Sequence, residues 1–204
     1  MSINPQTMSD EVLRRIGRSH DTKQIYKAYE DAVKADFKVI NMDLIAGLPG
    51  DTAEGFLTSV RKVIALDPDN ITIHTLALKK AAALYYERHN LPGSEEVAYM
   101  LDETEKLLRQ AGYEPYYLYR QKYMSGSFEN VGWCKPDTMS VYNIYMMEEL
   151  HTILSLGGGG MNKVNLGPNK LERFHNPKIP RDYIERIDTI LSQKDEIFAV
   201  LNSL

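Results

Sequence analysis

The 204-residue sequence contains a single cysteine, Cys134. One thiol excludes a disulfide within the chain and a structural zinc site built from several thiolates. It also excludes an iron–sulfur cluster held by three or four cysteines of this chain. We therefore expect Cys134 to be a buried or incidental thiol rather than a nucleophile.

The sequence also lacks an excess of basic residues and any long apolar run. It has 24 Lys and Arg against 28 Asp and Glu, a net charge of −4, which argues against binding of nucleic acid. No run reaches the roughly 18 apolar residues of a membrane span. The first residues, MSINPQTMSDE, have neither the basic nor the apolar region of a signal peptide. We expect a globular, cytoplasmic protein with no membrane partner.

Helix and strand patterns alternate from residue 22 to residue 46. Asp21 and Gln24 form a capping box, which predicts a helix over 22–35. The following run over 37–45 becomes apolar toward its end and predicts a strand.

The alternation continues after a glycine-rich break at 47–50. Asp51 and Glu54 form a second capping-box pattern, which predicts another helix, and the β-branched run 70–78 predicts another strand. Regular alternation with short loops is typical of parallel strands joined by crossover helices, an α/β architecture. Ser2-Ile3 fits a preceding strand with nothing before it to pair with.

The second half of the sequence has a different pattern, without regular alternation. We expect a helix over 94–110, an extended tyrosine-rich segment over 113–123, a helix within 138–154, a strand over 153–156, a loop-rich stretch over 164–180 and a last helix from about Arg181. These elements predict an α+β C-terminal extension.

Asp43 is the first candidate for chemistry, because it lies inside an apolar strand between Met42 and Leu44. A carboxylate near the carboxyl end of a parallel strand faces the catalytic end of an α/β barrel or sheet. Burying it without a partner is costly. The structural alternative is a helix cap or a salt bridge under a loop.

Other motifs carry weaker signals. The glycines over 157–160 lack the context of a phosphate-binding loop, so close packing is the preferred interpretation. The five histidines show no metal-binding spacing. The tyrosines over 113–123 fit either a platform for a flat ligand or a strand with one packed face.

Three segments together resemble the radical S-adenosylmethionine enzymes of the oxygen-independent coproporphyrinogen III oxidase family. The segment over 2–20 is similar to that family's S-I-x-x-Q-S-F…E-x-L-x-x-I-G-R-x-H motif. The segment over 40–52 is similar to I-N-x-D-L-I-x-G-L-P-x-Q-T. The segment over 73–78 is similar to the family's sixth barrel strand. The combined resemblance covers roughly residues 1–112.

The resemblance implies a partial (β/α) barrel of parallel strands with crossover helices, corresponding to the second half of such an enzyme. Residues 1–78 are expected to be that barrel half, and residues 79–204 the α+β extension. It also implies two cofactors, S-adenosylmethionine and a [4Fe-4S] cluster on a C-x-x-x-C-x-x-C loop. This sequence has no such loop, so the cluster cannot be held by the chain and we expect the chain alone to be catalytically silent.

Residue by residue, the resemblance places four positions against S-adenosylmethionine: Gln6, Arg18, Asp43 and Ala77. An amide, a guanidinium and a carboxylate suit the amino-acid, carboxylate and ribose groups of that cofactor, and a small Ala77 leaves room for adenine. We expect Gln6, Asp43 and Ala77 at the carboxyl ends of neighbouring strands. Tyr116 is a further adenine-side candidate.

The implied activity of the parent protein is oxidative decarboxylation of coproporphyrinogen III, a tetrapyrrole substrate, in heme synthesis. The rival interpretation is a heme- or porphyrin-binding relative without oxidase activity, and a distant third is an unrelated α/β-barrel enzyme. Because the first strand is expected to lack a neighbour, we also expect self-association into a homo-oligomer through the exposed barrel edge.

Overall fold

The computed structural model describes four stretches of the chain: residues 1–77, 91–119, 128–167 and 170–202. The chain divides into two compact units, Met1–Met139 and Ser140–Leu204. The boundary drawn from the sequence at residue 78 falls inside the first unit. The division into a barrel half over 1–78 and an extension over 79–204 therefore stays a prediction.

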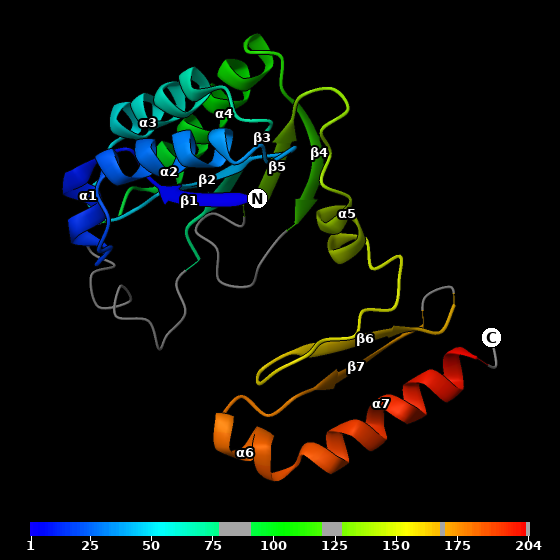
Figure 1. The fold of residues 1–204 in the computed structure, drawn as a ribbon. Helices are drawn as coiled ribbons and strands as arrows, with labels where there is room; N and C mark the ends of the chain where they lie inside the picture. Colours follow the sequence, from blue (N-terminus) through cyan, green and yellow to red (C-terminus); the bar gives the residue numbers. More distant parts are fainter. Residues whose placement is uncertain (78–90, 120–127, 168–169, 203–204) are drawn as a thin grey trace. The chain divides into compact units, whose positions relative to one another are not determined.

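A five-stranded sheet forms the first unit, in the order β1-β2-β3-β5-β4 (Figure 1). Its strands are β1 (Ser2–Gln6), β2 (Asn41–Ala46), β3 (Asn70–Thr75), β4 (Glu114–Tyr119) and β5 (Asn130–Cys134). β1, β2 and β3 are parallel, which confirms the expected α/β sheet. β5 pairs antiparallel with both β3 and β4. The partial barrel remains a prediction, because the structure establishes only the parallel-rich sheet.

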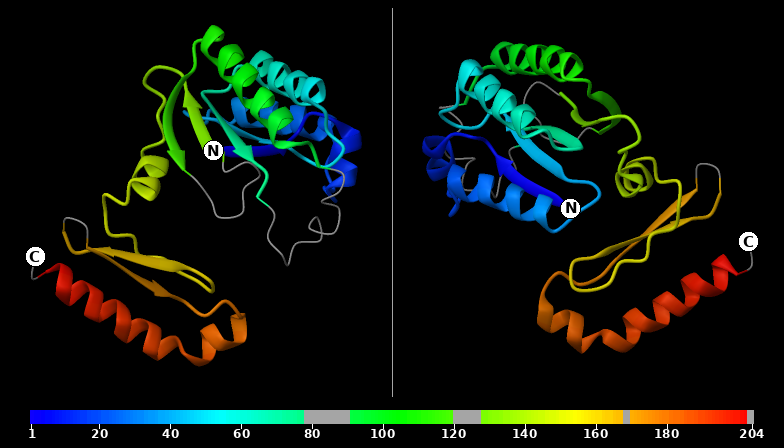
Figure 2. Two further views of the ribbon diagram at one scale, coloured as in Figure 1. Left: turned by 180° about the vertical axis from the view of Figure 1, so that it is seen from behind. Right: turned by 45° about the horizontal axis from the view of Figure 1, so that its top comes forward.

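Helices pack on one face of this sheet and make its core. They are α1 (Asp10–Arg15), α2 (Thr22–Lys34), α3 (Ala53–Leu66) and α4 (Ser94–Gln110) (Figure 2). A single buried apolar cluster joins α2, α3 and α4 to the strands, with members such as Ile25, Met42, Phe56, Ile71 and Met100. The exposed sides of these helices carry charges, so burial of one apolar stripe per helix holds the layers together.

The predicted capping box at the start of α2 is confirmed. The Gln24 amide donates to Asp21 Oδ1 at 2.8 Å, and the Asp21 amide donates to Gln24 Oε1 at 3.0 Å. These reciprocal bonds satisfy backbone donors that have no partner inside the helix.

The second predicted capping box is wrong. Thr52, not Asp51, caps α3, because its hydroxyl accepts from the Gly55 amide at 3.1 Å. Asp51 instead accepts from the neighbouring Thr52 amide and is buried beneath the helix start. The helix ends at Asp67, whose left-handed backbone (φ 62°) turns the chain into β3.

The second unit consists of α5 (Val141–Met147), the hairpin β6 (Met161–Asn165) and β7 (Leu171–His175), and the helices α6 (Pro180–Glu185) and α7 (Ile187–Leu201). The hairpin was not expected, because its sequences MNKVN and LERFH are too polar to read as strands. The predicted strand over 153–156 is wrong, since Ile153 makes only an isolated bridge to Lys163.

Element lengths also differ from the predictions. The helix expected within 138–154 covers only Val141–Met147, and the last helix is split in two at Arg186. The strand expected over 70–78 ends at Thr75, and Leu78 lies outside the described residues. By contrast, the predicted helix over 94–110 is confirmed to the residue.

Candidate functional site

The two faces of the sheet differ in chemistry. In β2, Met42, Leu44 and Ala46 are completely buried under the helices, whereas Asn41, Asp43 and Ile45 point to the opposite face and are partly exposed. This alternation is the two-residue period of a strand. We call the face that carries Asp43 the polar face; its side chains are Asn41, Asp43, Thr72, His74, Tyr117 and Tyr119.

Strand register brings these residues of distant sequence together. Asp43 lies opposite Thr72, and Ile45 lies opposite His74. Thr72 in turn lies opposite Gly132 of β5, which pairs with Tyr117 of β4. The polar face therefore extends across all the strands from β2 to β4.

Asn41 holds the Asp43 carboxylate from one side. Its side-chain amide donates to Asp43 Oδ1 at 2.6 Å and to the Ser2 hydroxyl at 2.9 Å. The Thr72 hydroxyl donates to the carbonyl of the same amide at 3.0 Å. Asn41 is thus fixed from β1 and β3 as well as from its own strand.

His74 faces Asp43 from the other side. Its Nε2 lies 3.8 Å from Asp43 Oδ2, and its Nδ1 lies 3.5 Å from the Tyr119 hydroxyl. The side chains of His74 and Asp43 are only 26% and 18% exposed. Asp43 is thus a sheltered carboxylate with one hydrogen-bond donor, Asn41, and an imidazole ring beside its second oxygen.

Two tyrosine rings of β4 lie on the polar face beside this pair. The rings of Tyr117 and Tyr119 stack with centroids 6.3 Å apart and planes 11° apart. Burial raises the pKa of Tyr117 to about 12, so its hydroxyl stays protonated and can donate. Gly132 makes room for this ring, because a Cβ at Gly132 would collide with it.

The four predicted cofactor positions lie in different parts of the first unit. Asp43 lies in the middle of β2, not at its carboxyl end as expected. Gln6 ends β1 and pairs with Leu44, while Ala77 follows the end of β3. Arg18 is exposed in the turn after α1. Gln6 and Asp43 therefore lie on neighbouring strands, whereas Ala77 lies farther along, and their roles toward S-adenosylmethionine stay predictions.

Asp51 is a charged group that the sequence analysis treated only as a cap. It is 8% exposed, and its Oδ2 has no hydrogen-bond partner among the described residues. Burial raises the pKa of this carboxyl to about 6, and the nearby Glu96 carboxylate adds to the shift. The departure from the family's Gln at this position was the signal that could have identified it.

Cys134 is buried in β5, where burial raises the pKa of its thiol. A raised pKa disfavours the thiolate that a metal or a nucleophilic reaction needs. Within the described residues, no group of three or more His, Cys, Asp and Glu side chains is arranged to hold a metal ion. The residues of this chain therefore do not fit a [4Fe-4S] cluster.

Of the glycines over 157–160, Gly160 is closely packed within the second unit, whereas a Cβ at Gly157 would meet nothing within 4 Å. A Cβ at Gly160 would collide with the Ser155 side chain. Lys194, 9% exposed, donates to the Ser155 carbonyl at 2.7 Å and to Asn162 Oδ1 at 3.0 Å. The lysine is thus directed at the protein's own acceptors, which favours the close-packing interpretation.

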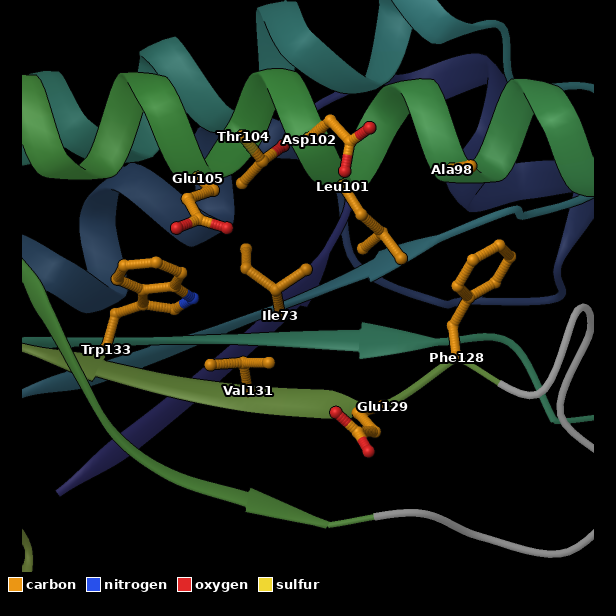
Figure 3. A pocket seen from close by; sticks show the side chains of 10 residues that line it. All are labelled: Ile73, Ala98, Leu101, Asp102, Thr104, Glu105, Phe128, Glu129, Val131 and Trp133. Atoms are coloured by element: carbon orange, nitrogen blue, oxygen red, sulfur yellow. The ribbon is translucent and has the colours of Figure 1, made fainter.

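A small groove opens on the helix side of the sheet, between α4 and the strands β3 and β5 (Figure 3). Its volume is about 200 Å³, with Ile73, Val131 and Trp133 on the sheet and Asp102 and Glu105 on α4. The groove lies on the face opposite Asp43, because its lining residue Ile73 pairs with Leu44, which is buried under the helices.

No helix in the described part of the chain has the length and apolar character needed to cross a membrane.

Comparisons with known proteins indicate the family to which the chain is related. Residues 1–63 match the model of the Radical SAM superfamily. The oxygen-independent coproporphyrinogen-III oxidase-like protein HemZ of Bacillus subtilis is 39% identical over 197 residues, covering 95% of this chain and 39% of that protein. The heme chaperone HemW of Haemophilus influenzae is 26% identical over 185 residues, covering 90% of this chain and 45% of that protein.

A solved structure has the same fold. Coproporphyrinogen III oxidase (HemN) from Escherichia coli, described as a radical SAM enzyme, superposes with a TM-score of 0.68 at 22% identity, over 92% of this chain and 43% of that one. The chain thus spans less than half the length of each of these three relatives. Taken with the family match over β1, β2 and most of α3, these similarities identify the chain as a partial-length member of the radical SAM superfamily, related to the coproporphyrinogen oxidases and heme chaperones.

Proposed function

We propose that this chain is the part of a radical SAM protein that binds the nucleoside portion of S-adenosylmethionine. The parent protein would be an oxygen-independent coproporphyrinogen III oxidase, which oxidatively decarboxylates propionate groups of a tetrapyrrole. The proposal is supported by the similarity to the oxidase-like protein of Bacillus subtilis along nearly the whole chain.

One observation carries the nucleoside assignment: a partly buried carboxylate, Asp43, lies on the polar face between the Asn41 amide, which donates to it, and the His74 ring, 3.8 Å away. A fixed carboxylate in a sheltered position is suited to accept from ribose hydroxyls. Gln6, on the neighbouring strand, would contact the same ligand, and Ala77 would leave space for its base. Arg18 would bind the methionine carboxylate after a movement of its exposed side chain.

The chain alone would bind S-adenosylmethionine but would not start a reaction. When present, the iron–sulfur cluster supplies the electron that cleaves S-adenosylmethionine, and it needs several thiolates close together. Cys134 is a single buried thiol. The protein's own contribution is therefore to bind and orient the nucleoside.

Nucleoside binding is testable on the chain as it is. We would titrate ¹⁵N-labelled protein with S-adenosylhomocysteine, a stable analogue of the cofactor, and follow amide shifts. The expected result is a saturable shift of amides in β1, β2 and β3 that is lost in Asp43→Asn. Asp31→Asn is the matched control, because Asp31 lies exposed on α2. Shifts that persist unchanged in Asp43→Asn would contradict the proposal.

A heme-binding function is the second candidate, because a heme chaperone aligns with 90% of this chain. Titrations with hemin and with coproporphyrin III, followed by absorbance and tryptophan fluorescence, separate the two functions. Preference for the metal-free porphyrin favours the oxidase parent. A tight hemin complex with no response to coproporphyrin favours the chaperone.

A further inference from the structure

We propose that His74 and Asn41 are positioning residues that direct the Asp43 carboxylate toward a vicinal diol, and that Tyr119 fixes the ring of His74. The ligand class is a ribonucleoside with both ribose hydroxyls free. This inference rests on the proposed nucleoside site and adds the groups that determine its selectivity.

The surroundings of His74 select one tautomer. Asp43 is an acceptor beside Nε2, and the Tyr119 hydroxyl, which can donate or accept, lies 3.5 Å from Nδ1. Of the two neutral tautomers, the one with the proton on Nε2 makes both contacts favourable, because Nε2–H then faces the carboxylate and Nδ1 accepts from Tyr119. At 3.8 Å, the Nε2–Oδ2 contact is electrostatic rather than a hydrogen bond, and it keeps the carboxylate turned toward the ring.

The orientation of the Asn41 amide is also determined by its neighbours. Because the Thr72 hydroxyl donates to Asn41 Oδ1, the amide nitrogen is left for the acceptors, Ser2 and Asp43. A flipped amide would place the carbonyl oxygen of Asn41 against the carboxylate oxygen of Asp43, and both atoms are acceptors. The network therefore aims one N–H of Asn41 at Asp43 Oδ1.

Among the described residues, the contacts with Asn41 and His74 leave one lone-pair site on each oxygen of Asp43 for a ligand. A carboxylate has about four lone-pair sites; Asn41 occupies one on Oδ1, and His74 faces one on Oδ2. Two adjacent hydroxyls can then donate to the two oxygens at once. A 2′-deoxyribose would fill only one of them and leave the other oxygen without its partner.

The test compares adenosine with 2′-deoxyadenosine by NMR titration of the folded chain. We expect adenosine to bind about tenfold more tightly, the size of one hydrogen bond to a charged group. His74→Leu should bring this ratio close to one, and His74→Gln, which keeps a donor, should restore most of it. His151→Gln is the matched control, because His151 belongs to the second unit.

A second measurement does not depend on any ligand. The ring ¹⁵N shifts of His74 should report the Nε2–H tautomer, and Tyr119→Phe should shift the Nδ1 resonance, whereas Tyr142→Phe should not. A His74 ring protonated only on Nδ1 would overturn the proposal. So would an adenosine preference that is unchanged in His74→Leu. Absence of any nucleoside binding would overturn the proposed function, and the diol assignment with it.

Discussion

The two faces of the five-stranded sheet are built from the same strands but are held together differently. On the helix face, side chains such as Met42 and Leu44 are completely buried, and they stabilise the fold through the apolar area that they remove from water. On the polar face, Asn41, Asp43 and His74 are joined by directional contacts and remain partly exposed. One strand therefore serves two purposes: alternate residues stabilise the fold, and the residues between them are available for chemistry.

The largest effect is expected on the helix face. Phe56 in α3 is completely buried in the core, so Phe56→Ala should lower the free energy of unfolding by about 3 to 5 kcal/mol through lost burial and a cavity. Urea denaturation measures this. Val33→Ala is the control, because Val33 is 54% exposed on α2 and should change little. Equal effects of the two substitutions would contradict the assignment of the core.

A smaller effect is expected where packing is tight on the polar face. Gly132→Ala should destabilise the chain by about 1 to 3 kcal/mol, because the added methyl meets the Tyr117 ring. Combining it with Tyr117→Ala should recover part of the loss, and a double-mutant cycle in urea gives the coupling. Additive effects would mean that the ring does not lie over Gly132.

Asp51 gives a pH-dependent effect on the helix side of β2. The pKa of its carboxyl is raised from the ordinary value of 3.8 to about 6 in the folded state. Between these two pH values, the folded protein keeps a proton that the unfolded chain has released. Stability should therefore fall as the pH rises through the interval between these values and stay lower above it. Asp51→Asn should stabilise the protein by about 1 to 2 kcal/mol at pH 8, less than the full shift implies because water keeps some access.

The check is thermal or urea denaturation of both proteins at several pH values. At pH 3, where Asp51 is protonated in both states, the difference should vanish. A stabilisation that is constant with pH would show that it does not come from the titration of Asp51.

The smallest effect on stability is expected at Asp43. Because Asn keeps an acceptor for the Asn41 amide, Asp43→Asn should change the free energy of unfolding by less than about 1 kcal/mol. The same substitution is expected to abolish the nucleoside response. A large loss of stability would mean that Asp43 belongs to the fold rather than to the site.

The sequence predicted those parts of the fold that depend on local signals. The capping box at Asp21 located α2, and the apolar spacing of 94–110 gave the bounds of α4. β5 was not predicted, because Asn130 and Gly132 are poor strand formers that are stabilised only by pairing with β3 and β4.

The candidate site was predicted only in part for a related reason. Asp43 stood out as a charge in an apolar strand. His74 and Tyr119 did not, because their contacts arise from register between strands. His74 of β3 lies beside Asp43 of β2, and Tyr119 of β4 contacts His74 across 45 residues of sequence. Periodicity within a segment carries no information on such pairs.

The backbone of Gln6 has a consequence for how this sequence can change. Gln6 ends β1 with a φ of 69°, and the register of β1 against β2 shifts just before it. For a residue with a side chain, this left-handed conformation costs roughly 1 kcal/mol, which glycine would avoid. Glycine at position 6 would remove this cost but also the side-chain amide that we propose contacts the nucleoside. On that proposal, Gln6→Gly should raise the thermal stability of the chain and lower its affinity for the ligand.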